Sequence, residues 1–376
     1  MSKRLLFVVN VDWFFISHRL IIAEKAVLNG FDVFVACQNT GRSDEIIEKG
    51  INFINLTISR SGTNPLLELS ALISIYKIYN NLKPDIVHHV TLKPIIYGSL
   101  ISKLTNIKTV VNAVSGLGYT FTKNRGGLVQ KLIVQLLRFV FNRKHLTVIF
   151  QNDDDQNLFK ELNIISKNNK IVKIKGSGVD LNKFKQLPYP SFDIIKIILP
   201  IRMVWDKGVK ELRKASEILK EKYKGKIQFI LIGLADVDNK AGVPASYLNE
   251  WQDGSYVKWI GYQKDMVEVY KDSHIVVLPS YREGMPKTLI EACAVGRAII
   301  TTDAIGCKEC VDEGINGFKV PVYSTKELAQ AIEKLILNKE LLIQMGNRSR
   351  HKAENEFNVD NVINTHLKIY NNINKV

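Results

Sequence analysis

Short apolar runs alternate with helical patterns along most of the chain, and this alternation restricts the possible folds more than any other feature. Alternation of this kind predicts an open parallel sheet with helices on both faces. In the first half, the expected strands are residues 4–10, 31–37, 51–56, 85–88, 109–113 and 146–151, and the expected helices are 17–28, 65–81 and 94–104.

A second series of the same kind follows. A Pro-Tyr-Pro sequence at residues 188–190 interrupts the pattern, and a new strand–helix series starts at residue 194. A chain of 376 residues is long enough for two domains. The sequence therefore predicts an α/β protein with two doubly wound, Rossmann-like domains of residues 1–187 and 188–358. Such sheets place ligands at the carboxyl ends of their strands, so two facing sheets would share one interdomain cleft.

The bulk composition is typical of a soluble globular protein, with 46% hydrophobic and 24% charged residues. The first residues lead directly into a strand-length run, and no apolar stretch approaches the roughly 20 residues of a membrane-spanning helix. The four cysteines do not suggest a disulfide framework. We interpret the Cys307–Cys310 spacing as incidental and reduced, and we expect a cytoplasmic protein.

The net charge of +15 favours nucleic acid, anionic lipid or a phosphorylated substrate as partner. The sequence shows no base-stacking motif or recognition-helix pattern, which makes nucleic acid the weaker choice. A lipid surface that carries diphosphate-linked substrates fits better.

The stretch 275–292 has the most specific chemistry. An expected strand at 275–278 breaks at Pro279 into a loop with Glu283 and Gly284, and a helix starts near Pro286. A helix start after a strand end can bind phosphate. Carboxylates cannot bind an anion, but they can accept hydrogen bonds from hydroxyl groups, which suggests a sugar diphosphate. The alternative is a loop-capping Glu283 followed by a solvated Glu291.

The string SYREGMPKTLIEA at residues 280–292 resembles the E-x7-E signature of glycosyltransferase family four. This family contains retaining, metal-independent nucleotide-sugar transferases of GT-B fold. The resemblance covers nearly the whole chain and is strongest over residues 200–317. It implies an acceptor-binding first domain and a donor-binding second domain, with the last helix, 359–376, packed back on the first.

Two cations precede this motif. Arg202 and Lys207 share a loop before a helix, where both could stabilise the charge of a departing nucleoside diphosphate. Such loop cations are more often simply solvated, but the family has Arg and Lys in the same loop. The resemblance makes Glu283, Arg202 and Lys207 the expected catalytic residues, and it implies that no metal or cofactor is needed.

By the same resemblance, Glu291 accepts from the ribose and Glu283 holds sugar hydroxyls. The remaining expected donor-binding residues are Gly284, Met285, Pro286, Lys287, Thr288, Tyr262 and Ser280. Tyr262 would flank a uracil, although a turn tyrosine that covers the core is nearly as common.

The acceptor side departs from the family pattern. Gly116, Leu117 and Gly118 follow the strand at 109–113, but the histidine that many members carry there is missing. The Gly-Gly loop after the first strand is also missing, and residues 11–15 replace it. The identity of any catalytic base therefore stays open.

These departures resemble a subgroup that builds lipid-linked oligosaccharides for bacterial surface polysaccharides and glycoproteins. The similar strings are Ser-His-Arg at 17–19, TLKPIIYG at 91–98 and SGLGY at 115–119. The resemblance implies that His18, Arg19, Lys93 and Gly116 line the cleft. His88 and His89 close the expected fourth strand, and one of them could face a ligand, although a strand-end histidine is more often structural.

Residues 123–144 combine a wide apolar face with several cations. Such a helix can lie in a bilayer interface, or it can be a core helix with solvated ends. With the net charge, it suggests peripheral attachment to the inner face of the cytoplasmic membrane.

Together these features predict transfer of a hexose, N-acetylhexosamine or hexuronic acid from a UDP-sugar to a polyprenyl-diphosphate-linked saccharide. Two alternatives stay open: a nucleotide-sugar epimerase of GT-B fold, and a basic protein that binds nucleic acid or lipid without catalysis.

Overall fold

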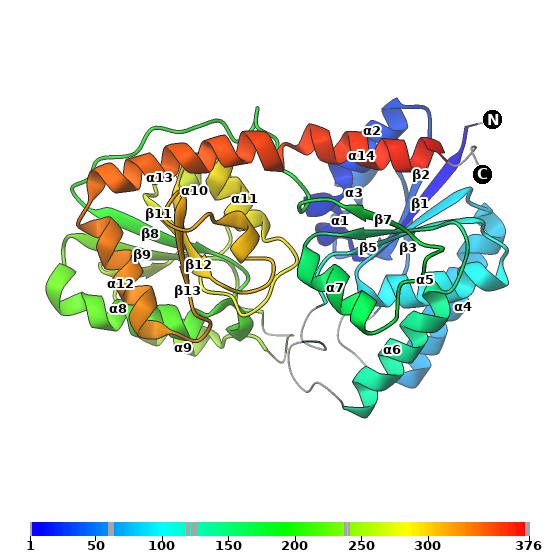
Figure 1. Cartoon of the computed structure of the whole chain (residues 1–376), viewed down its shortest axis with the longest axis horizontal. Helices are drawn as coiled ribbons and strands as arrows, with labels where there is room; N and C mark the ends of the chain where they lie inside the picture. Colours follow the sequence, from blue (N-terminus) through cyan, green and yellow to red (C-terminus); the bar gives the residue numbers. More distant parts are fainter. Residues whose placement is uncertain are drawn as a thin grey trace. The chain divides into compact units, whose positions relative to one another are not determined.

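A computed structural model describes residues 2–58, 64–117, 121, 127–236, 239 and 241–372. The chain divides into two compact units: residues 1–177 with 360–376 form unit 1, and residues 178–359 form unit 2. Figure 1 shows a parallel sheet with helices on both faces in each unit. The prediction of two Rossmann-like domains is confirmed.

Unit 1 contains a parallel sheet that has seven strands within the described residues, in the order β3-β2-β1-β4-β5-β6-β7. The strands are β1 (Arg4–Val11), β2 (Asp32–Gln38), β3 (Asn52–Asn55), β4 (Ile86–Val90), β5 (Thr109–Val114), β6 (Leu146–Phe150) and β7 (Lys170–Lys173). The helices are α1 (Asp12–His18), α2 (Leu20–Leu28), α3 (Ser43–Ile47), α4 (Pro65–Leu82), α5 (Leu92–Leu104), α6 (Leu128–Phe141), α7 (Asp153–Glu161) and α14 (Val359–Asn371).

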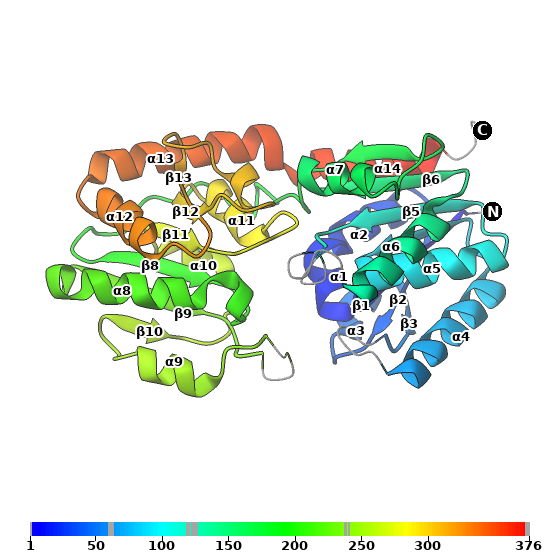
Figure 2. The ribbon, with the colours of Figure 1, turned by 60° about the horizontal axis from the view of Figure 1, so that its bottom comes forward.

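Strand β1 is buried on both faces of the sheet, because its continuous apolar run places apolar side chains on each face. Leu6 and Val8 join the core formed with α4, α5 and α6. Phe7 points the other way, and its ring contacts Phe15 and the Tyr370 ring of α14. Figures 1 and 2 show these two helix layers on opposite sides of the sheet.

The helix expected at 17–28 differs from the prediction. It begins at Asp12, directly after β1, and is broken at Arg19, where φ is −132°. The buried Asp12 carboxylate accepts hydrogen bonds from the backbone N–H groups of Thr40 (2.6 Å) and Arg42 (3.1 Å). These bonds tie the start of α1 to the loop after β2, in place of the glycine loop that the family pattern has there.

Unit 2 contains a parallel sheet that has six strands within the described residues, in the order β10-β9-β8-β11-β12-β13. The strands are β8 (Ile195–Pro200), β9 (Ile227–Ile232), β10 (Val257–Trp259), β11 (Ile275–Leu278), β12 (Ala298–Thr302) and β13 (Gly317–Val320). The α-helices are α8 (Val209–Tyr223), α9 (Ala245–Trp251), α10 (Met266–Lys271), α11 (Lys287–Ala294), α12 (Thr325–Ile336) and α13 (Lys339–Lys352), and the shorter helices are η2 (Trp205–Lys207), η3 (Lys308–Cys310) and η4 (Ala353–Phe357).

Candidate functional site

The strand order of unit 2 reverses between β8 and β11, which is where a doubly wound sheet binds its ligand. Lys207 follows β8 and Glu283 follows β11. Their side chains form an ion pair, with Nζ of Lys207 against Oε1 of Glu283. The side chains are 21% and 13% exposed, so both can also reach a ligand. The fold thus brings together the two predicted catalytic residues of opposite charge.

Backbone contacts fix this geometry. The N–H of Tyr281 donates to the carbonyl of Asp206 at 2.9 Å, and the Ser280 hydroxyl donates to the same carbonyl at 3.0 Å. Gly208 has a φ of +75°, and a Cβ there would lie 2.1 Å from the carbonyl oxygen of Pro279. Ser280, which the family resemblance predicts to lie near the donor, is completely buried. Its hydroxyl joins the two loops instead.

Helix α11 positions the second carboxylate. Pro286 precedes the helix, and Glu291 lies one turn inside it with its side chain almost completely buried. Glu291 lies 3.5 Å from Nζ of Lys287 and accepts from the Tyr270 hydroxyl at 3.2 Å. Burial raises the pKa of the Glu291 carboxyl. The Thr288 hydroxyl donates to the carbonyl of Pro200 at 2.8 Å, and this bond fixes the helix start at the end of β8.

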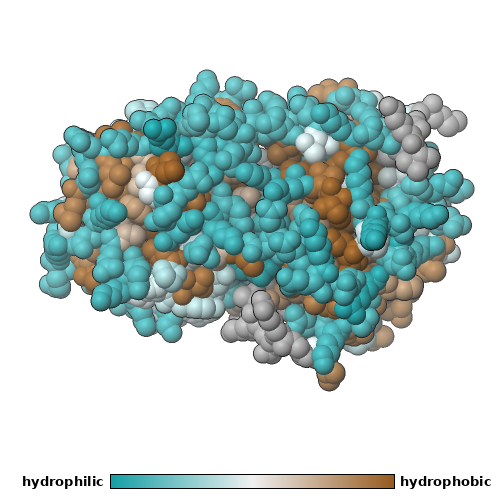
Figure 3. Space-filling model, in the orientation of Figure 1, coloured by the Kyte–Doolittle hydropathy of each residue, from teal (hydrophilic) through white to brown (hydrophobic). Residues whose placement is uncertain are grey.

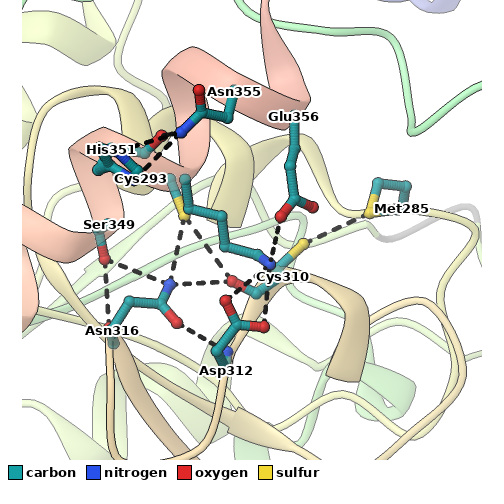
Figure 4. A network of polar contacts seen from close by, with 10 residues as sticks. Met285, Cys293, Cys310, Asp312, Asn316, Ser349, His351, Asn355 and Glu356 are labelled. Carbon is teal, nitrogen blue, oxygen red and sulfur yellow. Dashed lines mark hydrogen bonds and ion pairs between the residues drawn. The ribbon is translucent and has the colours of Figure 1, made fainter.

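A polar network connects α11 with η3 and α13 (Figure 4). Asn316 donates to the carbonyl of Cys310 at 3.1 Å and also contacts Ser349 and the sulfur of Cys293 on α11. The Cys310 thiol contacts the sulfur of Met285, in the loop before α11, at 3.5 Å. Burial raises the pKa of Cys293 to about 12, so this thiol stays protonated near neutral pH. These cysteines support the loop through packing.

Arg202 and Tyr262 lie at the same edge of the sheet, after β8 and β10. The Arg202 guanidinium pairs with Asp236 at 2.9 Å. Tyr262 is exposed. Gly233 packs closely against the backbone at Ile201, just before Arg202. A Cβ at Gly233 would lie 1.7 Å from the carbonyl oxygen of Ile201. Within the described residues, no group of three or more His, Cys, Asp and Glu side chains could hold a metal ion.

The expected acceptor residues of unit 1 also gather near a strand-order reversal, here between β1 and β4. Arg19 is buried; its guanidinium donates to Ser115 Oγ at 3.0 Å and to the carbonyl of His18 at 2.9 Å. Gly116 has a φ of +92°, a conformation that favours glycine. Arg19 therefore positions the loop after β5 and offers little surface to a ligand.

Leu117 was predicted on the acceptor side, but its side chain packs in the core of unit 1. Gly118, the last of the predicted loop residues, lies outside the described residues.

Lys93 lies at the start of α5. Its ion-pair partner is not among the residues predicted from the sequence. Nζ of Lys93 contacts Oε1 of Glu68 on α4 at 2.6 Å, and the Tyr97 hydroxyl donates to the other carboxylate oxygen at 2.7 Å. Glu68 is the one acidic residue of α4, and this isolated charge on the helix could have indicated an ion pair.

His89 does not line a ligand site. Its ring is completely buried: Nδ1 bonds to Asn112 Oδ1 and Nε2 to the Tyr79 hydroxyl, both at 2.7 Å. Gly98 leaves the space that the ring fills, since a Cβ there would lie 2.3 Å from Nε2. The expectation that His89 faces the acceptor is wrong, because β4 continues to Val90 and both ring nitrogens are already bonded.

Two family models match the chain. Residues 4–152 match the model "Glycosyl transferase 4-like", and residues 193–352 match "Glycosyl transferases group 1". The chain therefore belongs to the glycosyltransferases, with a glycosyl transferase 4-like domain in its first unit and a group 1 domain in its second. Neither alternative, epimerase or non-catalytic binding protein, finds support in these matches.

Two curated relatives are similar over most of the chain. One is the N,N'-diacetylbacillosaminyl-diphospho-undecaprenol alpha-1,3-N-acetylgalactosaminyltransferase of Campylobacter jejuni, 28% identical over 92% of each chain. Another is the UDP-Gal:alpha-D-GlcNAc-diphosphoundecaprenol alpha-1,3-galactosyltransferase of Escherichia coli, 25% identical over 88% of this chain and 86% of its own.

Solved structures share the fold. Sucrose-phosphate synthase from Thermosynechococcus elongatus has a TM-score of 0.80 at 16% identity and covers 99% of each chain. Anabaena HepE, solved in complex with UDP, has a TM-score of 0.77 at 16% identity, covering 98% of this chain and 100% of its own. At such identity the likeness establishes the GT-B fold alone.

Proposed function

We propose that this protein transfers a sugar from a UDP-sugar to a polyprenyl-diphosphate-linked saccharide, with retention of the anomeric configuration and without a metal ion. The observation that carries the proposal is the Lys207–Glu283 pair beside the first turn of α11. A cation and backbone N–H groups suit a diphosphate, whereas a carboxylate suits sugar hydroxyls, so the pair fits a sugar diphosphate better than either ligand alone.

In the proposed reaction, the bond from the sugar C1 to the diphosphate oxygen breaks, and a bond from C1 to the acceptor hydroxyl oxygen forms on the same face. The acceptor proton passes to the leaving diphosphate, as the resemblance to family four implies, so no separate base is needed. Lys207 and Arg202 would stabilise the developing negative charge, which is greatest in the transition state. Glu283 would hold the sugar in place and Glu291 the ribose.

The acceptor class is supported by the names of the two relatives. Both names specify a sugar on diphosphoundecaprenol and an alpha-1,3 linkage, and one specifies UDP-galactose as donor. Arg19, Lys93 and the Ser115–Gly116 loop of unit 1 are the proposed acceptor-side elements, with Arg19 acting through the loop that it positions.

A lipid-linked acceptor requires access to a membrane surface. Within the described residues, no helix is both long and apolar enough to cross a bilayer. We therefore propose peripheral attachment, supported by the net charge of +15 and by exposed apolar residues on α6.

The test is UDP release by purified protein from a panel of UDP-sugars, with a polyprenyl-diphosphate-linked saccharide and a chelator present. We expect release that requires acceptor, ignores the chelator and favours one donor, and an α-linked product by NMR. Loss of activity with chelator that a divalent cation restores would contradict metal independence. Release with GDP-sugars only would contradict the donor class.

A further inference from the structure

Unit 1 has a Lys–Glu pair of its own at the edge of the sheet where the strands end. Lys93 follows β4 closely, and its Nζ contacts Oε1 of Glu68 in the first turn of α4. The two side chains are 22% and 17% exposed, close to the values for the Lys207–Glu283 pair of unit 2. An ordinary surface pair is more open: the side chains of Lys271 and Glu268 are 59% and 64% exposed. The Lys93–Glu68 pair is therefore mostly buried but still within reach of a ligand.

A second side chain of α5 fixes the Glu68 carboxylate. The Tyr97 hydroxyl donates to Oε2 of Glu68 at 2.7 Å. Burial raises the pKa of Tyr97, and the hydrogen bond to Glu68 raises it further, so this hydroxyl stays protonated and acts as a donor. Each oxygen of Glu68 thus accepts one hydrogen bond, from Lys93 or from Tyr97, whereas a carboxylate oxygen can accept two. Glu68 is held in one orientation and can still accept from a ligand.

Glu68 is not one member of a charged helix surface. Its sequence neighbours Leu66, Leu67 and Leu69 are exposed leucines, and Figure 3 shows apolar atoms at the lower right, over α4. Helices α4 and α5 lie side by side, and the two bonds to Glu68 both come from α5 (Figures 1 and 2). A carboxylate that a neighbouring helix holds in one orientation has the preorganisation that a recognition residue needs.

The backbone that leads from β4 to Lys93 is strained. Thr91 has φ +75° and ψ 162°, a conformation that a residue with a side chain rarely adopts. Its hydroxyl oxygen is buried and finds no hydrogen-bond partner among the described residues. Both features lower the stability of unit 1, and such strain is found mainly at ligand-binding and catalytic sites. The turn that brings Lys93 to Glu68 therefore fits a role in binding better than a role in stability alone.

We propose that Glu68 reads the acceptor sugar: its carboxylate accepts a hydrogen bond from a hydroxyl or N–H group of that sugar, while Lys93 faces the diphosphate. This inference rests on the proposed function, which makes both substrates sugar diphosphates. A cation beside a carboxylate suits such a ligand in unit 1 for the same reason as in unit 2. Glu68 then determines acceptor specificity, because a mostly buried carboxylate discriminates strongly against a sugar that lacks the matching donor. Tyr97 is a positioning residue that acts through Glu68.

The experiment measures steady-state transfer by the full chain to a panel of water-soluble, short-chain prenyl-diphosphate saccharides. Glu68→Gln keeps the size of the side chain and an acceptor for Tyr97. It should raise the KM for the acceptor on the order of ten- to a hundredfold, because a charged hydrogen-bond acceptor is lost, and leave the KM for the UDP-sugar unchanged. The matched control is Glu24→Gln in the same unit, whose carboxylate lies 3.5 Å from Nζ of Lys49. The control should behave like the parent protein.

Acceptor analogues that each lack one hydroxyl or amide group identify the contact. One analogue should bind the parent more weakly than the intact acceptor does, but should bind Glu68→Gln about as well. Lys93→Gln should keep this penalty and lose the preference for a diphosphate over a monophosphate acceptor. Tyr97→Phe should raise the acceptor KM about threefold, with kcat and the UDP-sugar KM unchanged. A purely structural role of Tyr97 would change all three constants together and would contradict the positioning role.

Failure of this inference differs from failure of the proposed function. Transfer by the parent, with a parental acceptor KM in both Glu68→Gln and Lys93→Gln, would overturn the acceptor assignment and leave the function intact. Calorimetry with the acceptor alone gives a readout that does not depend on transfer. Acceptor binding that both variants weaken, without transfer from any nucleotide sugar, would overturn the function and retain the site. A parent that neither binds nor uses any member of the panel would overturn both.

Discussion

Lys207 and Glu283, separated by 76 residues in the sequence, form an ion pair at the point where the strand order of unit 2 reverses. The pair connects the loops after the two central strands, β8 and β11. In the proposed reaction each partner contacts a different part of the donor, Lys207 the diphosphate and Glu283 the sugar.

We expect Lys207→Ala and Glu283→Ala each to lower the rate of sugar transfer by roughly 10²–10³-fold, as is common when one preorganised stabilising group is lost. The exposed Lys210→Ala on α8 is the matched control and should keep parental activity. Steady-state UDP release measures the effect, and urea unfolding checks that each variant is folded. Near-normal turnover in either site variant would contradict the assigned role.

Glu291→Gln should weaken UDP binding about tenfold, because a charged acceptor for a ribose hydroxyl is lost. Calorimetry with UDP and its 2'-deoxy and 3'-deoxy analogues tests this directly. One deoxy analogue should bind the parent more weakly, yet bind the variant about as well as UDP does. The exposed Glu268→Gln on α10 serves as control. Equal penalties for the deoxy analogue in parent and variant would rule out this contact.

Gly208 and Gly254 provide a matched pair, since both have a φ of +75°. A Cβ at Gly254 meets nothing within 4 Å, whereas one at Gly208 would lie 2.1 Å from the carbonyl oxygen of Pro279. We expect Gly254→Ala to cost about 1–2 kcal/mol of stability, from backbone conformation alone. Gly208→Ala should cost at least about 3 kcal/mol, because the loops after β8 and β11 are forced apart.

Urea unfolding monitored by tryptophan fluorescence measures both costs, since Trp205, Trp251 and Trp259 all lie in unit 2. Equal costs would mean that the loops can move apart freely.

Unit 1 should lose stability in mild acid. Burial holds the pKa of His89 and His366 at about 3, and burial together with His366 and Arg19 holds that of His88 well below its usual range. These histidines bind protons in the unfolded chain below about pH 6.5 but stay neutral when folded. Their contribution is therefore complete above pH 6.5 and is lost as the pH falls toward 3.

At pH 5 the loss amounts to about 2 kcal/mol for each such histidine. Urea unfolding of unit 1 at pH 7.5 and pH 5 measures it, with circular dichroism and proteolysis as probes. His366→Phe should reduce the difference between the two pH values, because one proton-binding group is removed from the unfolded chain. An undiminished difference would show that His366 does not contribute.

The local pattern predicted those parts of the protein that depend on local chemistry. The strand–helix order predicted two parallel sheets, and the stretch at 275–292 predicted the strand and the following loop and helix, which carry Glu283 and Glu291. The partners of Glu291 and Arg202 could not be predicted, because Tyr270 and Asp236 reach these residues only through the packing of separate elements. His89 was placed wrongly for the same reason: its hydrogen-bond partners come from α4 and β5.

The last helix has a consequence for synthesis. The His88 ring of β4 bonds to the Tyr370 hydroxyl of α14 at 2.7 Å, across 282 residues of sequence. Unit 2 is one continuous segment and can fold as soon as it leaves the ribosome, but unit 1 lacks this core partner until α14 has been translated. At about 5–20 residues per second, the wait lasts on the order of ten seconds to a minute. During that interval the face of β4 around His88 is uncovered, so nascent chains stalled before residue 360 should be the ones that chaperones retain.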